Sequence, residues 1–326
     1  MSSFKGIYLC KLAALMLTGF WSAGVCAQAF PSKPMKIIAP FSPGGSVDLM
    51  ARYICLSFTK SFGQDCVVEN KPGAGGMIGM STMLAAPADG HTLAMMPSNL
   101  SIIPSVYSKV PYDTLKDVAP IALVSSTPLM IGTHPSVPAK SFQELISYIQ
   151  QSNGKVSFTA CGSASPQHLA GEMLGALASL NWRHIPYKGC AEAMVGVVSG
   201  EIPVWFSNYT HFAPQIKAGK LKGFAMLGAN RTTFAPEYPT VAESGFPGFE
   251  ASVWYGLIGS SKIPASVISR LNEEVNKALN TVEMKEKLRI GEYEPIGGSV
   301  QKFGEVIRSD MIKFETIIKK ANLKIE

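Results

Sequence analysis

Short apolar segments alternate with segments of helical periodicity along most of this 326-residue chain. This alternation is typical of α/β folds, in which helices connect the strands and cover the faces of the sheet. The sequence therefore predicts an α/β protein with largely parallel sheets. The expected strands are residues 35–39, 66–68, 92–96, 156–160, 184–187, 202–206, 221–227 and 253–258. The expected helices are residues 47–58, 78–86, 142–151, 167–177, 191–198, 265–279, 282–290 and 300–321, with Ser46 capping the first and Gly63 ending it.

The length of the chain fits two lobes, of which the second is inserted into the first. We expect residues 28–127 and 251–326 to form the first lobe and residues 128–250 the second. Two chain crossings, near residues 125–132 and 248–254, would then form the hinge between the lobes.

The first 27 residues read as a secretory signal peptide. Lys5 and Lys11 make a basic start, an apolar run follows, and residues 25–27 (VCA) offer small residues for cleavage before Gln28. A membrane anchor and a lipoprotein acylated at Cys26 are the alternatives. Removing these residues takes away two lysines and no acids, so the formal charge falls from +6 to +4. This weak charge, without a Lys/Arg stripe, argues against nucleic acid as a partner. The signal peptide predicts a periplasmic protein, and we expect the mature chain to be soluble because no later apolar run is long enough to cross a bilayer.

Four cysteines remain after the signal peptide, an even number for an oxidising compartment. Three pairings are open, of which we favour Cys55–Cys66 and Cys161–Cys190. Four buried free thiols are the alternative. A zinc site is less consistent with the sequence, because no Cys-x-x-Cys pair or histidine cluster occurs.

Two glycine-rich loops indicate what the protein binds. Residues 42–46 follow the first expected strand, residues 72–76 follow the second, and each loop opens a helix. Backbone amides at a helix N-terminus, together with the helix dipole, favour an anion. Neither loop has the lysine and hydroxyl of a P-loop or the spacing of a dinucleotide fingerprint. The pattern therefore favours a small carboxylate over a nucleotide.

Further small and polar residues follow the other expected strands, where α/β sheets bind their ligands. For any single loop, a tight turn that requires glycine explains the residues equally well. The candidate ligand-binding residues are Ser42, Pro43, Gly44, Gly45, Ser46, Asp48, Ala74, Gly75, Gly76, Ser98, Asn99, Gly162, Ser163, Ala164, Ser165, His168, Tyr187, Lys188, Gly189 and Asn208.

Three of these candidates have plainer explanations. Asp48 lies in the first turn of its helix, where it complements the dipole or orients a neighbouring loop, and we favour this over catalysis. Lys188 is the one cation of the set and is equally explained as a solvated loop lysine. His168 follows a serine-rich loop, but no Gly-x-Ser-x-Gly elbow accompanies it. Trp205 and Trp254 fall in expected strands and are predicted to be core residues.

Several motifs together resemble the Bug-type receptors, the extracytoplasmic solute-binding proteins of tripartite tricarboxylate transporters. The similarity covers essentially the whole mature chain. It rests on residues 40–48 (PFSPGGSVD), 68–76 (VENKPGAGG), 88–93 (ADGHTL), 186–189 (PYKG), 217–221 (KAGKL), 239–245 (PTVAESG), 249–250 (FE) and 254–257 (WYGL).

The resemblance implies a two-lobed, type-II periplasmic-binding fold that closes on a small organic acid. In the family, backbone groups and water hold the carboxylate at the loops matching 42–46 and 72–76, with residues matching 162–168 and 187–189 contributed by the second lobe. Some members share a pairing like Cys161–Cys190, which would make one wall of the cleft rigid. These loops contain no arginine, so they lack the side chain that could hold a carboxylate through two parallel hydrogen bonds.

We therefore expect a periplasmic receptor and not an enzyme, a monomer without cofactor or metal, serving membrane permease subunits. A secreted hydrolase or transferase using Ser163 or Ser165 with His168 is one alternative. An orphan receptor that signals to a sensor protein is another.

Overall fold

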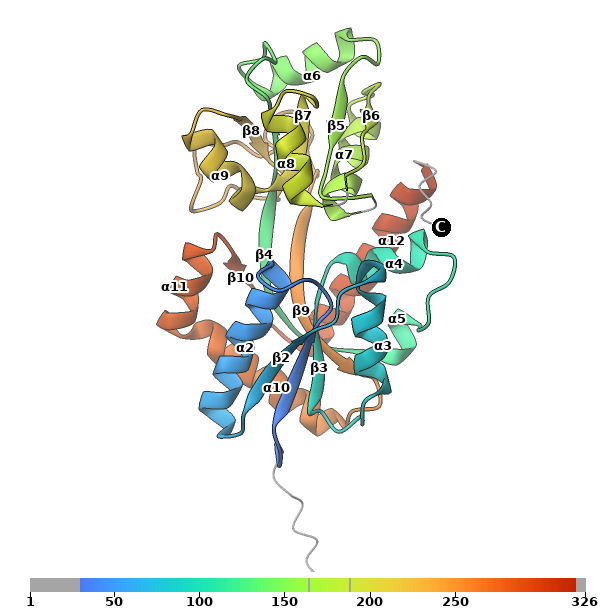
Figure 1. Cartoon of the computed structure of the whole chain (residues 1–326), viewed down its shortest axis with the longest axis vertical. Helices are drawn as coiled ribbons and strands as arrows, with labels where there is room; N and C mark the ends of the chain where they lie inside the picture. Colours follow the sequence, from blue (N-terminus) through green and yellow to red (C-terminus); the bar gives the residue numbers. More distant parts are fainter. Residues whose placement is uncertain (1–29, 164, 188, 321–326) are drawn as a thin grey trace, which may run out of the picture. The chain divides into compact units, whose positions relative to one another are not determined.

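The first half of the chain forms strands that alternate with helices. The computed structural model describes residues 30–163, 165–187 and 189–320, and the chain from Lys33 onward forms one compact unit. Figure 1 shows α2 and α3 beside strands β1–β3; α2 contacts all three strands, and α3 contacts β1 and β3. These elements are β1 (Met35–Ala39), α2 (Ser46–Phe62), β2 (Cys66–Asn70), a single 3₁₀ turn η1 (Ala74–Gly76), α3 (Met77–Ala85) and β3 (Thr92–Pro97).

Three further groups of elements complete the structure. The first group is α4 (Asn99–Val106), α5 (Thr114–Asp117) and β4 (Val118–Thr133). The next group is α6 (Phe142–Gln151), β5 (Ser157–Thr159), α7 (Pro166–Leu177), β6 (Arg183–His184), α8 (Cys190–Val198), β7 (Val204–Asn208), α9 (Tyr209–Lys217) and β8 (Lys222–Met226). The chain closes with β9 (Ser252–Ser260), α10 (Ala265–Asn280), α11 (Val282–Ile290), β10 (Glu294–Pro295) and α12 (Val300–Lys320).

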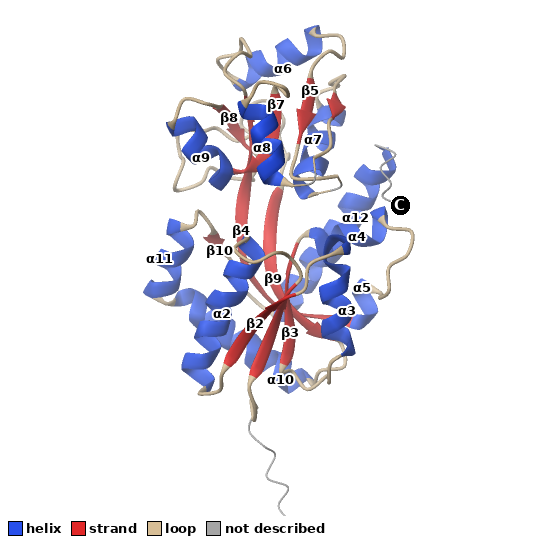
Figure 2. Cartoon of the chain, viewed as in Figure 1, coloured by secondary structure: helices blue, strands red, loops and turns tan. Residues whose placement is uncertain are grey.

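Strand β4 belongs to both parts of the sheet. From Val118 to Pro128 it pairs with β9, whereas from Leu129 to Thr133 it pairs with β7. Strand β8 pairs with this last part of β4 as well. Figure 2 shows β4 and β9 as the two long strands that run alongside each other. The strand order is β2-β1-β3-β9-β4-β7-β5-β6, with β8 and β10 attached to β4.

The sheet is mixed, so the expectation of largely parallel sheets is wrong. Strands β1, β2 and β3 pair in parallel, as do β5, β6 and β7. Strands β4, β8, β9 and β10 make antiparallel pairs. The reason is topological: the chain leaves the first group of strands through β4 and returns to it through β9. Two neighbouring strands that carry the chain in opposite directions must pair antiparallel.

The ends of α2 show one confirmed prediction and one that is wrong. Gly63 ends the helix in the left-handed conformation, with φ +68°, as expected. Ser46 does not cap the helix, because Gly45 occupies the N-cap position without a side-chain hydrogen bond. The Ser46 hydroxyl instead accepts a hydrogen bond from Tyr293, 2.6 Å away.

Two apolar clusters fill the structure on either part of the sheet. Trp254 packs with residues of β3, α4 and α12, and Trp205 packs with Phe212 of α9. Both tryptophans are buried, which confirms their prediction as core residues. A third, smaller cluster joins Leu169 of α7 to apolar residues of α4 and α12. Among the described residues, no helix has the length and apolar character needed to cross a membrane.

Candidate functional site

Asp48 holds the first glycine-rich loop in place. Its carboxylate accepts hydrogen bonds from the Gly44 backbone N–H at 3.0 Å, from Arg52 Nε at 2.9 Å and from Asn70 Nδ2 at 3.0 Å. Burial raises the pKa of Asp48, but the hydrogen bonds from Arg52, Gly44 and Asn70 outweigh it, so the pKa lies below its usual value. Because this carboxylate is an anion with its oxygens in use, Asp48 organises the loop and is not itself offered to a ligand.

The second glycine-rich loop has an uncommon backbone. Four consecutive residues have positive φ: Gly73 at +132°, Ala74 at +48°, Gly75 at +63° and Gly76 at +107°. Three of the four are glycines, which adopt this conformation at little cost. A Cβ on Gly75 would also lie 2.9 Å from the Tyr107 hydroxyl. The glycines therefore let the chain turn sharply into α3, with the Gly76 N–H donating to the Gly73 carbonyl at 3.0 Å.

A chain of polar contacts connects the first loop to the second part of the sheet. The Tyr255 hydroxyl lies beside both Ser46 and Asn208, and these two neighbours act to lower its pKa. Asn208 Oδ1 accepts a hydrogen bond from Gln167 Nε2 at 2.7 Å, and Tyr293 donates to Ser46. Burial raises the pKa of Tyr255 and of Tyr293, so both hydroxyls keep their protons. Ser46 at the start of α2 and Asn208 at the end of β7 are thus brought together by a single tyrosine.

Two members of this network, Tyr255 and Tyr293, were not among the predicted site residues, and Gln167 was predicted only as part of the segment 162–168. Gln167 directly follows the serine-rich loop, so its position was a usable signal. Tyr255 follows Trp254 in a strand, where only the alternation of sides distinguishes it from a core residue. Tyr293 contacts Ser46 across 247 residues of sequence, and no local pattern predicts such a contact.

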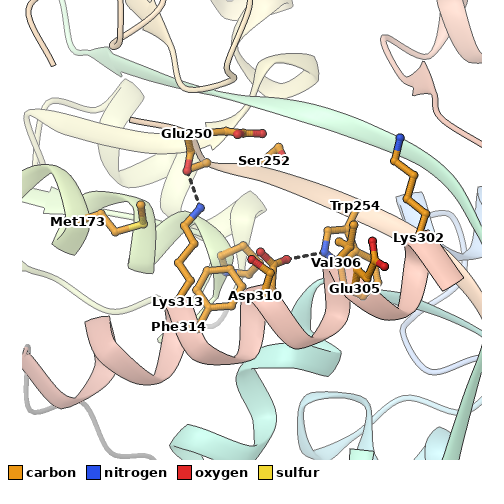
Figure 3. Close-up of a pocket in the computed structure, with 13 residues that line it drawn as sticks. Met173, Glu250, Ser252, Trp254, Lys302, Glu305, Val306, Asp310, Lys313 and Phe314 are labelled. Carbon is orange, nitrogen blue, oxygen red and sulfur yellow. Dashed lines mark hydrogen bonds between the residues drawn. The ribbon is translucent and has the colours of Figure 1, made fainter. Parts of the chain in front are cut away.

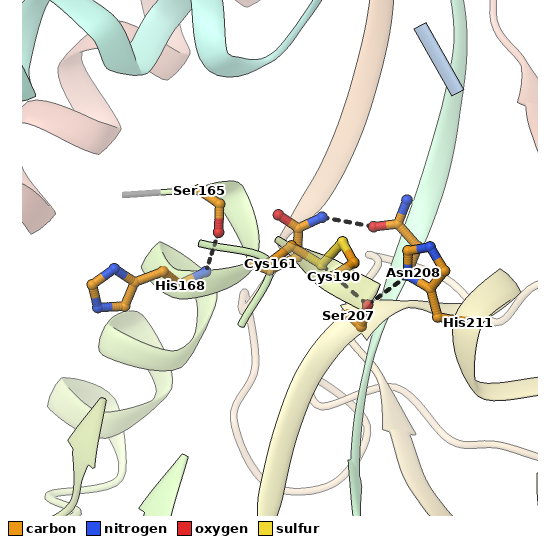
Figure 4. Close-up of a disulfide and its surroundings, with 8 residues drawn as sticks. Cys161, Ser165, His168, Cys190, Ser207, Asn208 and His211 are labelled. Carbon is orange, nitrogen blue, oxygen red and sulfur yellow. Dashed lines mark hydrogen bonds between the residues drawn. A yellow bond between two sulfur atoms is a disulfide. The ribbon is translucent and has the colours of Figure 1, made fainter. Parts of the chain in front are cut away.

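The loop between β5 and α7 uses its serine to begin a helix. Ser165 is the N-cap of α7, and its hydroxyl accepts a hydrogen bond from the His168 backbone N–H at 3.2 Å. The His168 imidazole stacks on His184 with ring centroids 3.6 Å apart, and its Nε2 lies 3.3 Å from Glu172. In Figure 4 this imidazole points away from Cys161 and Asn208. The structure therefore does not bring the His168 ring together with the Ser46–Asn208 network.

The remaining predicted residues have mixed placements. Ser98 is completely buried at the N-cap of α4, and its hydroxyl has no hydrogen-bond partner among the described residues. Asn99 is the first residue of α4, and Gly189 is the N-cap of α8. The Tyr187 hydroxyl is hydrogen-bonded to Glu201. Ala164 and Lys188 lie outside the described residues. Gly162 is half-buried. The other predicted loop residues are exposed, namely Ser42, Pro43, Gly44, Gly45, Ala74 and Ser163.

Two disulfides tie neighbouring segments together. Cys55 of α2 is bonded to Cys66 of β2, and Cys161 is bonded to Cys190 at the start of α8. These are the two pairings that the sequence favoured. The second bridge joins the loop before α7 to the loop before α8, both of which carry predicted site residues (Figure 4).

A pocket of about 430 Å³ lies on a different surface, against α12 and the start of β9 (Figure 3). Two of its charged groups serve the fold: Asp310 accepts a hydrogen bond from Trp254 Nε1 at 2.7 Å, and Lys313 donates to the Glu250 carbonyl at 2.7 Å (Figure 3). Burial raises the pKa of Asp310. None of the predicted site residues lines this pocket, so it does not support the carboxylate site.

The stacked histidines predict a pH dependence of stability. Burial and the neighbouring His168 lower the pKa of His184 to about 3 from its ordinary 6.5, and its Nε2 has no partner in the described part of the chain. Above pH 6.5 the ring is neutral in both the folded and the unfolded chain. Below this value only the unfolded chain takes up the proton, so the free energy of unfolding should fall by at most about 1.4 kcal/mol per pH unit down to about pH 3.

Denaturant titrations of the wild type and His184→Gln across this pH range measure the effect. We expect the variant to show a shallower loss of stability on acidification. His134→Gln, at a half-buried histidine whose Nδ1 lies 2.8 Å from the Ser136 hydroxyl, serves as the control and should follow the wild type. Parallel curves for His184→Gln and the wild type would show that this imidazole does not couple to folding.

The fold and the site define a class of protein. The structure superposes on a protein described as a periplasmic transporter with TM-score 0.80 and 33% identity, covering 91% of this chain and 100% of that one. It also superposes on Rpa4515 of R. palustris, solved with adipate, with TM-score 0.80 and 27% identity over 90% and 99% of the two chains. These neighbours confirm the two-lobed fold of a periplasmic binding protein.

The family follows from the sequence itself. Residues 50–323 match the model of the tripartite tricarboxylate transporter family receptor, and the chain belongs to this family. The protein BugT of Bordetella pertussis is 30% identical over 98% of both chains. The solved periplasmic binding protein BugD aligns with TM-score 0.77 and 29% identity, over 91% of this chain and all of that one. The Bug-type resemblance is thereby confirmed, and the family is one of solute-binding receptors.

Proposed function

We propose that this protein captures a small carboxylic acid between two lobes in the periplasm. The lobes are residues 28–127 with 251–326 and residues 128–250, and residues 1–27 are the export signal. The ligand carboxylate would lie at the N-terminus of α2 and beside the loop at residues 73–76. Asn208, Gln167 and the loop at residues 162–165 would contact it from the second lobe. No catalytic residue is assigned.

One observation carries this proposal: the Tyr255 hydroxyl lies beside Ser46 and Asn208, which belong to the two proposed lobes. Around it lie the uncapped N-terminus of α2, whose first amides have no intrahelical acceptors, and the glycine loop before α3. Several such donors acting together would hold an anion without an arginine. The relative solved with adipate, a dicarboxylate, supports the ligand class.

Calorimetry and thermal shift with a panel of acids test the proposal. The panel contains succinate, malate, adipate, glutamate and benzoate, and native mass spectrometry first establishes that the purified protein carries no ligand. We expect at least one acid to bind and raise the melting temperature. If no acid in the panel binds to protein shown to be free of ligand, the proposed ligand class is wrong.

A conservative variant tests the site. Tyr255→Phe removes only the hydroxyl that joins Ser46 and Asn208, and a hydrogen bond of this kind contributes about 1 kcal/mol. We expect the affinity for the bound acid to fall roughly 5-fold. Tyr148→Phe, on α6, is the matched control and should bind as the wild type does. Equal affinities for both variants would place the ligand elsewhere.

The proposed partners are the membrane subunits of a tripartite transporter, to which a monomeric receptor would deliver its ligand. Delivery to a sensor protein is the alternative. Uptake of the identified acid by cells that carry or lack this receptor distinguishes the two, because only the transport role makes uptake depend on it.

A further inference from the structure

Three side chains with metal-binding atoms converge beside the proposed ligand loops. The sulfur atoms of Cys161 and Cys190 and a ring nitrogen of His211 all lie within 4.8 Å of one another. They come from three places: the loop between β5 and α7, the first turn of α8 and the first turn of α9. Figure 4 shows the three together with Ser207. Each is half-buried, so water and small solutes can reach the cluster.

The histidine is held in place by its neighbours. Its Nδ1 lies 2.7 Å from the Ser207 hydroxyl, which in turn lies 3.3 Å from Cys161 Sγ. The imidazole also stacks on Trp205, with ring planes 19° apart. A ring fixed on both its edge and its face keeps its position when the sulfurs change their bonding, as metal sites require of their ligands.

Two thiolates and an imidazole are a ligand set for thiophilic divalent cations. Zinc binds sulfur at about 2.3 Å and imidazole nitrogen at about 2.0 Å in a tetrahedron, which places the ligand atoms roughly 3.5–4 Å apart. Atoms that already lie within 4.8 Å need only small side-chain rotations to reach this geometry. Cys190 is also the first residue of α8, so a thiolate there would lie at the positive end of a helix dipole.

We propose that the reduced form of this protein binds one Zn²⁺-like cation through Cys161, Cys190 and His211. In the disulfide form the two sulfurs are bonded to each other and do not ligate. A dithiol reductant converts one form to the other by exchange: the S–S bond breaks, two electrons and two protons pass to the cysteines, and the reductant becomes a disulfide. The cation then displaces the two thiol protons and takes water or the Ser207 hydroxyl as its fourth ligand.

The other disulfide provides an internal comparison. Within the described residues, Cys55 and Cys66 belong to no such group of three ligand atoms. Short Cys and His spacings are absent around Cys161 and Cys190 as well, so this site arises from the fold and not from a sequence motif. The proposal is independent of which organic acid the receptor takes.

The experiment uses the purified protein reduced with a dithiol, freed of reductant without air, and titrated with Co²⁺ as a spectroscopic substitute for Zn²⁺. The C55S/C66S variant carries only the pair of interest, and C161S/C190S carries only the other pair. We expect one equivalent of Co²⁺ to bind to reduced wild type and to C55S/C66S, with the absorption of a tetrahedral thiolate complex. Oxidised protein and C161S/C190S should show none.

His211→Ala tests the third ligand and should weaken Co²⁺ binding at least 10-fold. Alkylation followed by mass spectrometry gives a second reading: Zn²⁺ should protect Cys161 and Cys190, but not Cys55 and Cys66, in protein whose circular dichroism is native. The proposal is overturned if folded, reduced protein binds no Co²⁺. It is equally overturned if binding survives unchanged in C161S/C190S or in His211→Ala.

Discussion

Asp48→Ala should lower the free energy of unfolding by about 2–4 kcal/mol, because three donors lose one shared acceptor. Asp48 is 4% exposed, and its carboxylate receives the Gly44 N–H, the Arg52 guanidinium and the Asn70 amide. Arg52 and Gly44 are exposed and can turn to water without great cost, whereas the half-buried Asn70 amide keeps only its hydrogen bond to the Phe41 carbonyl. Urea unfolding monitored by circular dichroism measures the change.

The same substitution should weaken ligand binding by at least roughly 10-fold, since it frees the loop that carries the proposed amide donors. Asp48→Asn is the matched control: it keeps the shape and one acceptor oxygen, so we expect an intermediate loss of both stability and affinity. Asp65→Ala, at the turn before β2, controls for the loss of a carboxylate as such. A stable Asp48→Ala protein with unchanged affinity would remove Asp48 from the organisation of this loop.

Loss of the Cys161–Cys190 bridge is the second change with a large expected effect. Replacing both cysteines by serine releases a loop with a sequence separation of 29, and the chain-entropy relation gives about 3–4 kcal/mol for such a loop. The matched C55S/C66S variant opens a separation of 11 and should lose about 3 kcal/mol. Both variants should remain folded at 25 °C, and guanidinium unfolding measures each loss.

The two variants should differ more clearly in function than in stability. Cys161–Cys190 joins two of the loops proposed to contact the ligand, whereas Cys55–Cys66 joins the middle of α2 to the beginning of β2. We therefore expect C161S/C190S to bind the organic acid less tightly than C55S/C66S at equal temperature below both transitions. Identical affinities would mean that the bridge stabilises the fold without shaping the site.

Local sequence patterns predicted the elements that carry the loops. The strand, glycine loop and helix at β1–α2 and the same arrangement at β2–α3 were predicted because each signal lies within about a dozen residues. The structure shows Asp48 in the orienting role considered for it. This role was within reach of local patterns, because Gly44 and Arg52 are each four residues away and Asn70 ends the next strand. Both tryptophans were placed in the core for the same local reason.

Long-range contacts were beyond such patterns. The bond between Tyr293 and Ser46 joins the last part of the chain to the first, and the double role of Tyr255 depends on which elements are adjacent. Helix α9 was missed, since Pro214 lies inside it and proline ordinarily argues against a helix. The antiparallel pairs of β4 and β9 likewise follow from the route of the chain between lobes, which periodicity does not encode.

Strand β4 makes the two halves of this receptor inseparable during folding. Its first eleven residues complete one set of strands beside β9, and its last five lie between β7 and β8 in the other. Cutting the polypeptide after Pro128 would separate Val118–Pro128 of β4 from β9, its partner strand in the downstream fragment. The two fragments could restore this pairing only by reassociating. Fragments produced separately should therefore stay unstructured or aggregate alone, and regain a common structure only when mixed.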